Sequence, residues 1–426
     1  MGSADDVVVT GLGLVTPLGI GVEATRAALA AGASKLHPPV APVPSTLPVG
    51  CVGTVAGLDP EALLENSHKS LKFMSRDAEL GVCAGRLAWL DAGLDGSDVD
   101  PEGVGLYVGA GLEPRLIADY ADSIAASQEG PAEPFDPEAL LHHGLKSLDP
   151  ATMLRSLSNM VAAHISIELG LRGPNSVPTP HAASGAQALG RGLDAIREGD
   201  ANVVLAGAAD AKCDTLGLVT NLQLGILSAS PDPAEACAPL TERAFGTALG
   251  EGAAILVLER RDHAEARGAR IHATLRGFGE VNRAPAEHGD TAEAAGFVRS
   301  MQRALEDASV GPDAIELVHP DASGLRRGDA VEAEAIAAVF GGSVPSVFSA
   351  KPQSGHLLAA AAPWAASVLA LILGDTVPPY PVAGPARAGI GFDPWTSTKA
   401  RPKLGLVNAW GLSGVYASLV VEAGNG

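Results

Sequence analysis

Three short segments of the sequence combine ionisable and small side chains in patterns typical of a catalytic site. They are residues 175–185 (NSVPTPHAASG), 318–329 (VHPDASGLRRGD) and 351–356 (KPQSGH). In the first, an extended stretch ends at small residues and a helix is predicted from 185 to 198, so position 182 lies where helix amides favour developing negative charge. A nucleophile there would be activated, but the residue is Ala182, which has no nucleophilic atom.

The remaining motifs indicate neither a nucleotide nor a metal site. Gly11-Leu-Gly13-Leu-Val-Thr16 begins like a dinucleotide fingerprint, but Thr16 replaces the third glycine, so we expect a strand that stops at a structural turn. His142-His143 is expected to be a solvated pair in a Pro-rich setting. Four dispersed cysteines without a CxxC pair predict neither a disulfide framework nor zinc, and we expect no cofactor: Cys51, Cys83, Cys213 and Cys237.

Composition narrows the class of protein and its partners. The chain has 426 residues, 46% of them hydrophobic and 4% aromatic, which predicts a globular α/β protein with an Ala-, Val-, Leu- and Ile-filled core. Lys+Arg 29 against Asp+Glu 49 gives a net charge of −20, which disfavours nucleic acid and anionic membranes as partners. The amino terminus resembles no secretory signal, so we expect a cytoplasmic protein. Residues 357–373 are apolar but contain Pro363 and Ser367, and we expect a buried core helix.

Strands alternate with helices along the chain, which predicts a mostly parallel sheet covered on both faces. We expect strands at 6–13, 103–109 and 201–207, and helices at about 116–126 and 152–169. A second strand that ends in Gly-x-Gly, at 271–279, echoes the first. We therefore predict two similar βαβ-type halves packed face to face, 1–260 and 261–426.

Taken together, the motifs resemble the β-ketoacyl synthase family of the thiolase-like fold, nearly end to end. The matching segments are 7–19, 74–80, Asn159-Met160, 165–167, 173–175, 199–201, 205–207, 250–253, Asp329 with Glu332, and Lys351 with Gly355-His356. The resemblance implies a layered α/β/α/β/α architecture. It also implies a site where members of the family hold an acyl chain on a Cys thiolate and use two histidines to decarboxylate a malonyl unit.

Carried over residue by residue, the resemblance leaves a degenerate triad. The nucleophile position falls on Ala182, the first histidine on Asp321 and the second on His356, with Lys351 retained. Ala182 cannot form an acyl-enzyme, and an ionised Asp321 would repel both the malonyl carboxylate and the developing enolate. The loop that carries the family's gating Phe falls on Gly411, Leu412 and Ser413, with Leu412 at the gate.

Changes at several catalytic positions indicate a natural pseudoenzyme. Within the family, a chain with these changes resembles the chain length factor, which is the ketosynthase β subunit of type II polyketide synthases. An Asp in place of the first histidine and Ala361-Ala-Pro363 after the second resemble that subfamily, whereas such subunits often carry Gln where this chain has Ala182. The resemblance implies a heterodimer with a ketosynthase α subunit, and contact with an acyl carrier protein through that complex.

The same resemblance assigns a dimer strand and a tunnel. The strand is expected at 175–180, where Pro178 and Pro180 shorten the backbone ladder; its residues are Asn175, Ser176, Val177 and Thr179. The tunnel lining falls on Leu112, Glu113, Leu116, Leu154, Leu157, Met160 and Val161. Ordinary helix core is an equally good interpretation of Leu154, Leu157 and Val161, and a surface salt bridge is one for Glu113.

Two further functions stay open at this point. One is a decarboxylase that acts on malonyl groups tethered to acyl carrier protein through His356 and Lys351, although Asp321 counts against it. The other is a homodimeric scaffold that binds a carrier protein without chemistry. Without its partner residues, His356 is expected to keep a structural role.

Overall fold

The computed structural model of the protein describes residues 6–40, 42–111, 117–128, 134–283, 293–341, 344–374 and 402–424. The strands are β1 (Val7–Thr16), β2 (Gly19–Ile20), β3 (Val52–Gly53), β4 (Val104–Ala110), β5 (Asn175–Ser176), β6 (Val203–Asp210), β7 (Leu249–Gly250), β8 (Gly252–Arg260), β9 (Ala273–Asn282), β10 (Leu317–His319), β11 (Ser346–Val347), β12 (Leu404–Gly411) and β13 (Val415–Ala423). The α-helices are α1 (Val22–Ala31), α2 (Pro60–Leu63), α3 (Arg76–Asp91), α4 (Ile117–Ala125), α5 (Pro137–Ala139), α6 (Leu145–Ser147), α7 (Thr152–Arg155), α8 (Met160–Leu169), α9 (Ser184–Glu198), α10 (Thr215–Gln223), α11 (Pro233–Ala236), α12 (Arg261–Ala266), α13 (Ala294–Ala308), α14 (Arg326–Phe340), α15 (Lys351–Ser354) and α16 (Ala361–Leu373). Shorter 3-10 turns are η1 (Leu71–Phe73), η2 (Pro101–Gly103), η4 (His181–Ala183), η5 (Pro312–Ala314) and η6 (Leu358–Ala360), and η3 (Leu140–Gly144) is a π-helix.

Most described strands join one mixed sheet with two wings. The order is β11-β10-β12-β13-β9-β1-β8-β6-β4-β5, and β2 pairs with β1. The wings meet where β1 and β9 pair antiparallel over three residue pairs. The boundary predicted after residue 260 falls at the end of β8, the last strand of the first wing along the chain.

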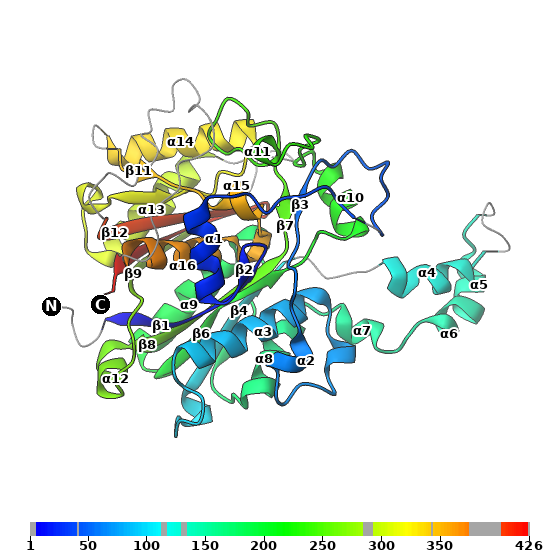
Figure 1. The fold of residues 1–426 in the computed structure, drawn as a ribbon, viewed down its shortest axis with the longest axis horizontal. Helices are drawn as coiled ribbons and strands as arrows, with labels where there is room; N and C mark the ends of the chain where they lie inside the picture. The colour runs from blue at the N-terminus through cyan, green and yellow to red at the C-terminus, as the bar shows by residue number, and fades with distance from the viewer. Residues whose placement is uncertain are drawn as a thin grey trace.

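Helices cover both faces of each wing and also fill the space between the wings. One core cluster packs α9 and α16 against residues of both wings, from β1, β6 and β8 on one side and from β12 and β13 on the other. A second cluster packs α3 and α8 on the outside of the first wing, and a third packs α13 and α14 on the outside of the second. These are five layers (Figure 1), so the predicted α/β/α/β/α architecture is confirmed.

The apolar run at 357–373 is a core helix, as predicted. Every residue of α16 is buried. Pro363 is tolerated because it lies in the first turn of α16, where the N–H it lacks would have no partner inside the helix. Among the described residues, no helix has the length and apolar character needed to cross a membrane.

Two predicted elements differ in the structure. The first strand does not stop at a turn near Gly13 but continues to Thr16, with a register shift between Val9 and Gly11 in its pairing with β8. The helix predicted at 152–169 is interrupted between α7 and α8. There the Ser156 hydroxyl donates to the carbonyl of Met153 (3.0 Å), a local bond that competes with continued helix.

The register shift explains why glycines stand in β1. Before it, Val7 and Val9 face the middle layer; after it, Leu12 and Leu14 do, so Gly11 and Gly13 face α3. A Cβ built on Gly13 would lie 1.8 Å from the carbonyl oxygen of Ala84. The glycines therefore permit close strand–helix packing, a structural reason for this motif that differs from the predicted turn.

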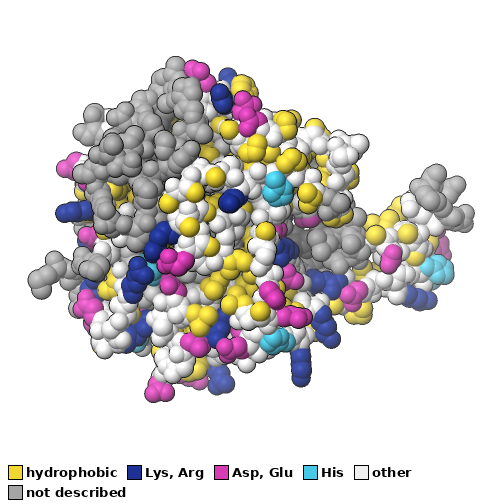
Figure 2. Space-filling view, in the orientation of Figure 1, with side chains coloured by type: hydrophobic (Ala, Val, Ile, Leu, Met, Phe, Trp, Pro, Cys, Tyr) yellow, Lys and Arg dark blue, Asp and Glu magenta, His cyan; other side chains and the backbone are white. Residues whose placement is uncertain are grey.

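A helical arm, defined here as α4 to α6 (residues 117–147), extends away from the body (Figure 1). Four of the twelve exposed large apolar side chains among the described residues lie on it, namely Ile124, Phe135, Leu141 and Leu145. Three more, Met153, Leu154 and Leu157, lie in and just after α7, where the chain returns to the body. Apolar side chains on the arm are open to view in Figure 2, so the arm presents apolar surface that the described part of the chain leaves open.

The packing of β1 on α3 predicts that Gly13→Ala lowers the free energy of unfolding by about 3 kcal/mol, because the added methyl group overlaps backbone rather than a movable side chain. Gly103→Ala is the matched control, since its Cβ would meet nothing closer than Asn202 Nδ2 at 3.9 Å. Urea unfolding followed by circular dichroism measures both; equal stability of the two variants would contradict the packing argument.

Candidate functional site

Ala182 lies in η4, directly before α9, as predicted from the sequence. It is buried, and the preceding residue, His181, has a φ of 62°, a strained conformation for a residue other than glycine. The Ser184 hydroxyl donates to the carbonyl of Ala110 at the end of β4 (2.8 Å), which ties the start of α9 to the sheet. The positive end of α9 therefore lies next to Ala182.

The structure brings the three degenerate triad positions together. Ala182, Asp321 and His356 line one cavity of about 40 Å³, to which Leu412 of the β12–β13 turn also contributes. They come from four separate elements: η4, the loop after β10, the segment after α15, and the β12–β13 turn. Apolar side chains complete the lining, namely Ile226, Phe297, Leu325, Leu358 and Trp410.

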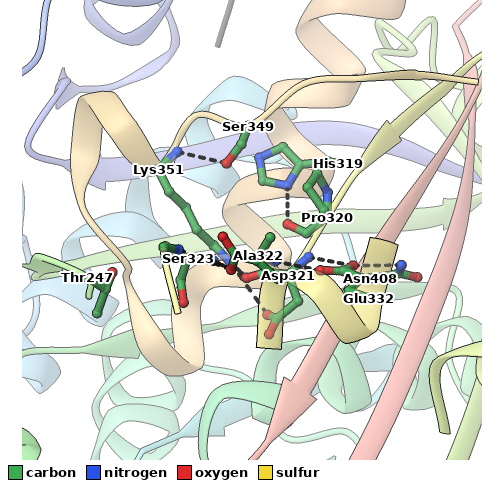
Figure 3. Close-up of polar contacts among 12 residues, drawn as sticks. Thr247, His319, Pro320, Asp321, Ala322, Ser323, Glu332, Ser349, Lys351 and Asn408 are labelled. Atoms are coloured by element: carbon green, nitrogen blue, oxygen red, sulfur yellow. Dashed lines mark hydrogen bonds and ion pairs between the residues drawn. The ribbon is translucent and has the colours of Figure 1, made fainter. Parts of the chain in front are cut away.

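Asp321 and Lys351 form a buried pair (Figure 3). The Lys351 ammonium donates to the carbonyl oxygen of Asp321 and lies 3.6 Å from Oδ1 of the same residue. Burial raises the pKa of the Asp321 carboxyl, while the Lys351 charge acts in the opposite direction. Lys351 therefore lies beside the carboxyl group of Asp321, at whose position the resemblance places a histidine imidazole.

Two acidic residues of α14 hold the loop that carries Asp321 (Figure 3). Glu332 accepts the backbone N–H groups of Asp321 (2.9 Å) and Ala322 (2.7 Å), and the amide of Asn408 donates to it at 2.9 Å. Asp329 accepts the N–H groups of Ser323, Gly324 and Leu240. The two carboxyl groups thus fix four consecutive residues, 321 to 324.

These buried acids have raised pKa values. Burial, together with the nearby Asp321 carboxyl, raises the pKa of Glu332 to about 7. Burial raises the pKa of Asp329 to about 6, although three backbone N–H groups donate to this carboxyl group and act to lower its pKa. The carboxyl groups of Asp321, Asp329 and Glu332 therefore surround the cavity. Among the described salt bridges, the only one made by any of these three residues joins Asp321 to Lys351.

The nearby histidines are neutral. Burial first, and the Lys351 charge second, lower the pKa of His356 well below its ordinary value and that of His319 to about 3. His319 Nε2 accepts the N–H of Ala350 (3.2 Å), and Nδ1 lies 3.2 Å from the carbonyl of Pro320, which fits one neutral tautomer. His356 therefore supplies no cation to bind a carboxylate.

The predicted gate loop faces the start of α9. A Cβ on Gly411 would lie 2.1 Å from the carbonyl oxygen of Pro180, so the loop approaches η4 closely. The exposed Ser413 hydroxyl donates to the same oxygen at 3.4 Å. Leu412, half-buried between them, lines the cavity.

The predicted dimer strand is an exposed sheet edge. Asn175 and Ser176 form β5, which pairs with β4 alone at the end of the sheet order and whose residues are both exposed. Val177 is half-buried and Thr179 exposed, and Pro178 accepts the N–H of Ala110 through its carbonyl (3.1 Å). The backbone ladder is short, as expected from the prolines.

The predicted tunnel residues are not gathered around this cavity. Val161 packs in the core against α3, where a Cβ on Gly81 would lie 2.4 Å from it. Leu154 and Leu157 are exposed, and Met160 is half-buried. Leu112, Glu113 and Leu116 lie outside the described residues. Of the described four, none lines the cavity beside Ala182.

Sequence reasoning missed a second buried polar group beneath the site. Asp210, at the end of β6, accepts the backbone N–H of Ala359 through Oδ2 (3.2 Å) and lies 3.2 Å from the Lys212 ammonium. A Cβ on Gly111 would lie 2.2 Å from this carboxyl group. Asp210 thus links the end of the first wing to η6; the one signal for it in the sequence is a charged residue that ends an otherwise apolar strand.

Among the described residues, no group of three or more His, Cys, Asp or Glu is arranged to hold a metal ion, and the four cysteines are free thiols. His142 and His143 lie on the arm and are exposed.

Comparisons with known proteins agree with this architecture. Residues 4–264 match the family model "Beta-ketoacyl synthase, N-terminal domain", and residues 272–382 match "Beta-ketoacyl synthase, C-terminal domain". The 3-oxoacyl-[acyl-carrier-protein] synthase 2 of Vibrio cholerae is 30% identical, with 98% of each chain covered. The tetracenomycin polyketide synthase ketoacyl synthase beta subunit of Streptomyces glaucescens is 32% identical, with 99% of each chain covered.

Solved structures show the same fold. The ishigamide ketosynthase/chain length factor superposes with a TM-score of 0.86 at 27% identity, covering 99% of this chain and 100% of that one. A type II polyketide synthase acyl-carrier protein in complex with its ketosynthase bound to the hexaketide gives a TM-score of 0.81 at 26% identity, covering 98% and 99%.

The neutral, buried His319 predicts a contribution to stability that is lost in mild acid, opposite in sign to the contributions of Glu332 and Asp329, whose raised pKa values favour the folded state as the pH falls. The pKa of His319 is about 3 when folded and near 6.5 when unfolded, so unfolding takes up a proton below about pH 6.5. Between pH 7 and pH 5 this residue should lower the free energy of unfolding by about 2 kcal/mol. His319→Asn should remove that part of the pH dependence, whereas the exposed control His142→Asn should follow the wild type. Parallel curves for wild type and His319→Asn would contradict the assignment.

Proposed function

The chain belongs to the beta-ketoacyl synthase family, and from this premise we propose that it is a non-catalytic chain length factor. In this role it forms a heterodimer with a ketosynthase α subunit and shapes the acyl tunnel that sets polyketide or polyene chain length. The observation that carries the proposal is the cavity in which Ala182 and Asp321 occupy two of the three catalytic positions.

The chemistry of that cavity opposes condensation. A methyl group at position 182 cannot attack a thioester, so no acyl-enzyme forms on this residue. A malonyl carboxylate that entered would meet Asp321, Asp329 and Glu332, and the neutral His356 offers it no charge. Asp321 places an acceptor at a position where stabilisation of a malonyl-derived enolate needs a donor or a cation.

Two relatives support a subunit role. The tetracenomycin relative is a ketoacyl synthase beta subunit, and the ishigamide structure contains a chain length factor. Many other relatives are 3-oxoacyl-[acyl-carrier-protein] synthases, which are named as enzymes. The residues at positions 182 and 321 are what separate the two roles in this chain.

Exposed surfaces support a protein partner. The edge strand β5 offers unpaired backbone groups, and the arm exposes four large apolar side chains. We propose that the α subunit covers both. An acyl carrier protein would then reach the chain through that complex, because the net charge of −20 disfavours direct contact with an acidic carrier.

The partner would also complete the tunnel. Met160 and the exposed Leu154 and Leu157 lie at and beside the start of α8, next to the arm. We propose that they line the closed end of a tunnel formed at the interface, together with Leu112, Glu113 and Leu116. Val161, already packed against α3, would support this wall from behind.

A malonyl-carrier decarboxylase is the competing function. Lys351 and His356 are both present at the site, which is the observation in its favour. The carboxyl group of Asp321 occupies the place where that reaction needs a donor. Release of carbon dioxide from malonyl carrier protein by the isolated chain, abolished by His356→Ala, would establish this function instead.

The arm predicts how assembly responds to substitution. Purified together, this chain and its α subunit should form a one-to-one heterodimer, and Leu141→Asp should weaken it at least about tenfold because a charge would be buried at the interface. Val40→Asp is the matched control, since both side chains are 64% exposed and Val40 lies outside the arm. Light scattering and titration measure this; a stable wild-type homodimer that binds carrier protein without the α subunit would favour the scaffold.

Tunnel length predicts the product. Met160→Trp adds bulk at the proposed closed end, so the heterodimer should release chains at least one extension unit shorter, as measured by mass spectrometry of the products. Leu90→Trp, at an exposed position on α3, should leave product length unchanged. Products of unchanged length from an intact Met160→Trp heterodimer would remove Met160 from the lining.

A further inference from the structure

The cavity beside Ala182 is built for a polar occupant. Its volume of about 40 Å³ accommodates two or three water molecules. His356 is 7% exposed, and its Nδ1 has no hydrogen-bond partner among the described residues, as is also true of His181 Nδ1. Buried polar atoms in folded proteins are paired with protein groups or water, so two open positions here indicate that a polar molecule binds beside them.

The Asp321 carboxyl group is held in place at this cavity while keeping lone pairs free. Its backbone N–H is bound by Glu332, and Lys351 contacts it from one side at 3.6 Å. Burial raises the pKa of this carboxyl group, whereas Lys351 and the backbone N–H of Trp410 favour its charged form. These two donors leave carboxylate lone pairs open to a water molecule. A fixed carboxylate beside water is the arrangement of a general base.

The start of α9 supplies the complementary charge. This fifteen-residue helix directs its positive end at Ala182, on the same cavity. Negative charge that develops on an oxygen next to the Ala182 methyl group is stabilised there. A base and an anion-stabilising element thus face one space large enough for water, with no side-chain nucleophile at the helix start.

We propose that this cavity hydrolyses neutral acyl thioesters, with Asp321 as the general base for a bound water molecule. The water oxygen attacks the thioester carbonyl carbon while Asp321 accepts one of its protons. The carbonyl π electrons move to the oxygen that faces the start of α9. When this intermediate collapses, the C–S bond breaks and the thiolate takes the proton back from Asp321, which yields a carboxylic acid and a thiol.

The lining selects the class of substrate. Ile226, Leu325 and Leu412 offer apolar contact to an aliphatic acyl or thiol arm. The three carboxyl groups repel a malonyl carboxylate, so malonyl thioesters are excluded. The reaction needs no covalent intermediate and no partner subunit. It is a hydrolysis separate from the chain length role, in which 'non-catalytic' means that the chain carries out no condensation.

The test uses the full chain and S-octanoyl-N-acetylcysteamine as the probe, with thiol release followed by a chromogenic disulfide. We expect turnover above the uncatalysed rate, one atom of heavy oxygen in octanoate formed in labelled water, and little release from the S-malonyl analogue. Asp321→Asn keeps the side-chain shape but removes the base, and should lower the rate about 100-fold. Glu334→Gln, an exposed residue of α14, is the charge-matched control and should retain the wild-type rate.

A second variant guards against misfolding of the first. Ala182→Val fills the cavity without altering any charge and should also abolish turnover, while the melting temperature shows whether each variant is folded. Release at the blank rate by wild type, or equal rates for wild type and a folded Asp321→Asn, would overturn the proposal. Heterodimer formation and product length are measured separately, so failure here leaves the chain length proposal standing, and the reverse also holds.

Discussion

The middle helical layer is the constraint on which the rest of the molecule depends. α9 and α16 lie between two sheet wings: every residue of α16 is buried, and α9 exposes only Arg191, Arg197 and Glu198, so small side chains must fill the contacts. A Cβ on Gly185 would lie 2.4 Å from Pro363 Cδ, which shows how closely the two helices approach. This explains a composition with many alanines and glycines and few aromatic residues. It also brings η4 and η6 together at the ends of the two wings, where the site is built.

Much of this could be predicted from the sequence because the signals are local. Val-rich strands, the apolar run that forms α16, and the small residues before α9 are each read from neighbouring residues, and they indicated the α/β class and the place of Ala182. The five layers were implied by the resemblance. The mostly parallel sheet predicted from the alternation of strands and helices is wrong, because the central strands pair antiparallel. The break between α7 and α8 was not foreseen, because Ser156 has no periodic signature. The continuation of β1 past Gly13 depends on a register shift, which arises from pairing with a strand more than 240 residues away along the chain.

In the site, likewise, the residues could be predicted from the sequence, whereas the interactions that hold them in place could not. Its members Ala182, Asp321, His356 and Leu412 were identified through a resemblance of motifs, and they do share a cavity. The interactions that hold them were not predictable: Glu332 binds backbone N–H groups ten and eleven residues earlier, and Asp210 reaches a helix start that lies 149 residues away. Such contacts are set by tertiary packing. The resemblance also grouped Val161 with the tunnel lining, whereas the side chain is part of the core, because helical spacing alone does not say which face meets which neighbour.

The exposed arm has a consequence for the cell that makes this protein. A chain released from the ribosome without a partner would carry apolar side chains on a thin projection, which is what chaperones and proteases recognise. Excess copies would then be degraded or aggregate, so the steady-state amount of this chain would follow the amount of whatever covers the arm. Balanced synthesis of the two chains would thus be enforced by the structure itself, without any dedicated regulator.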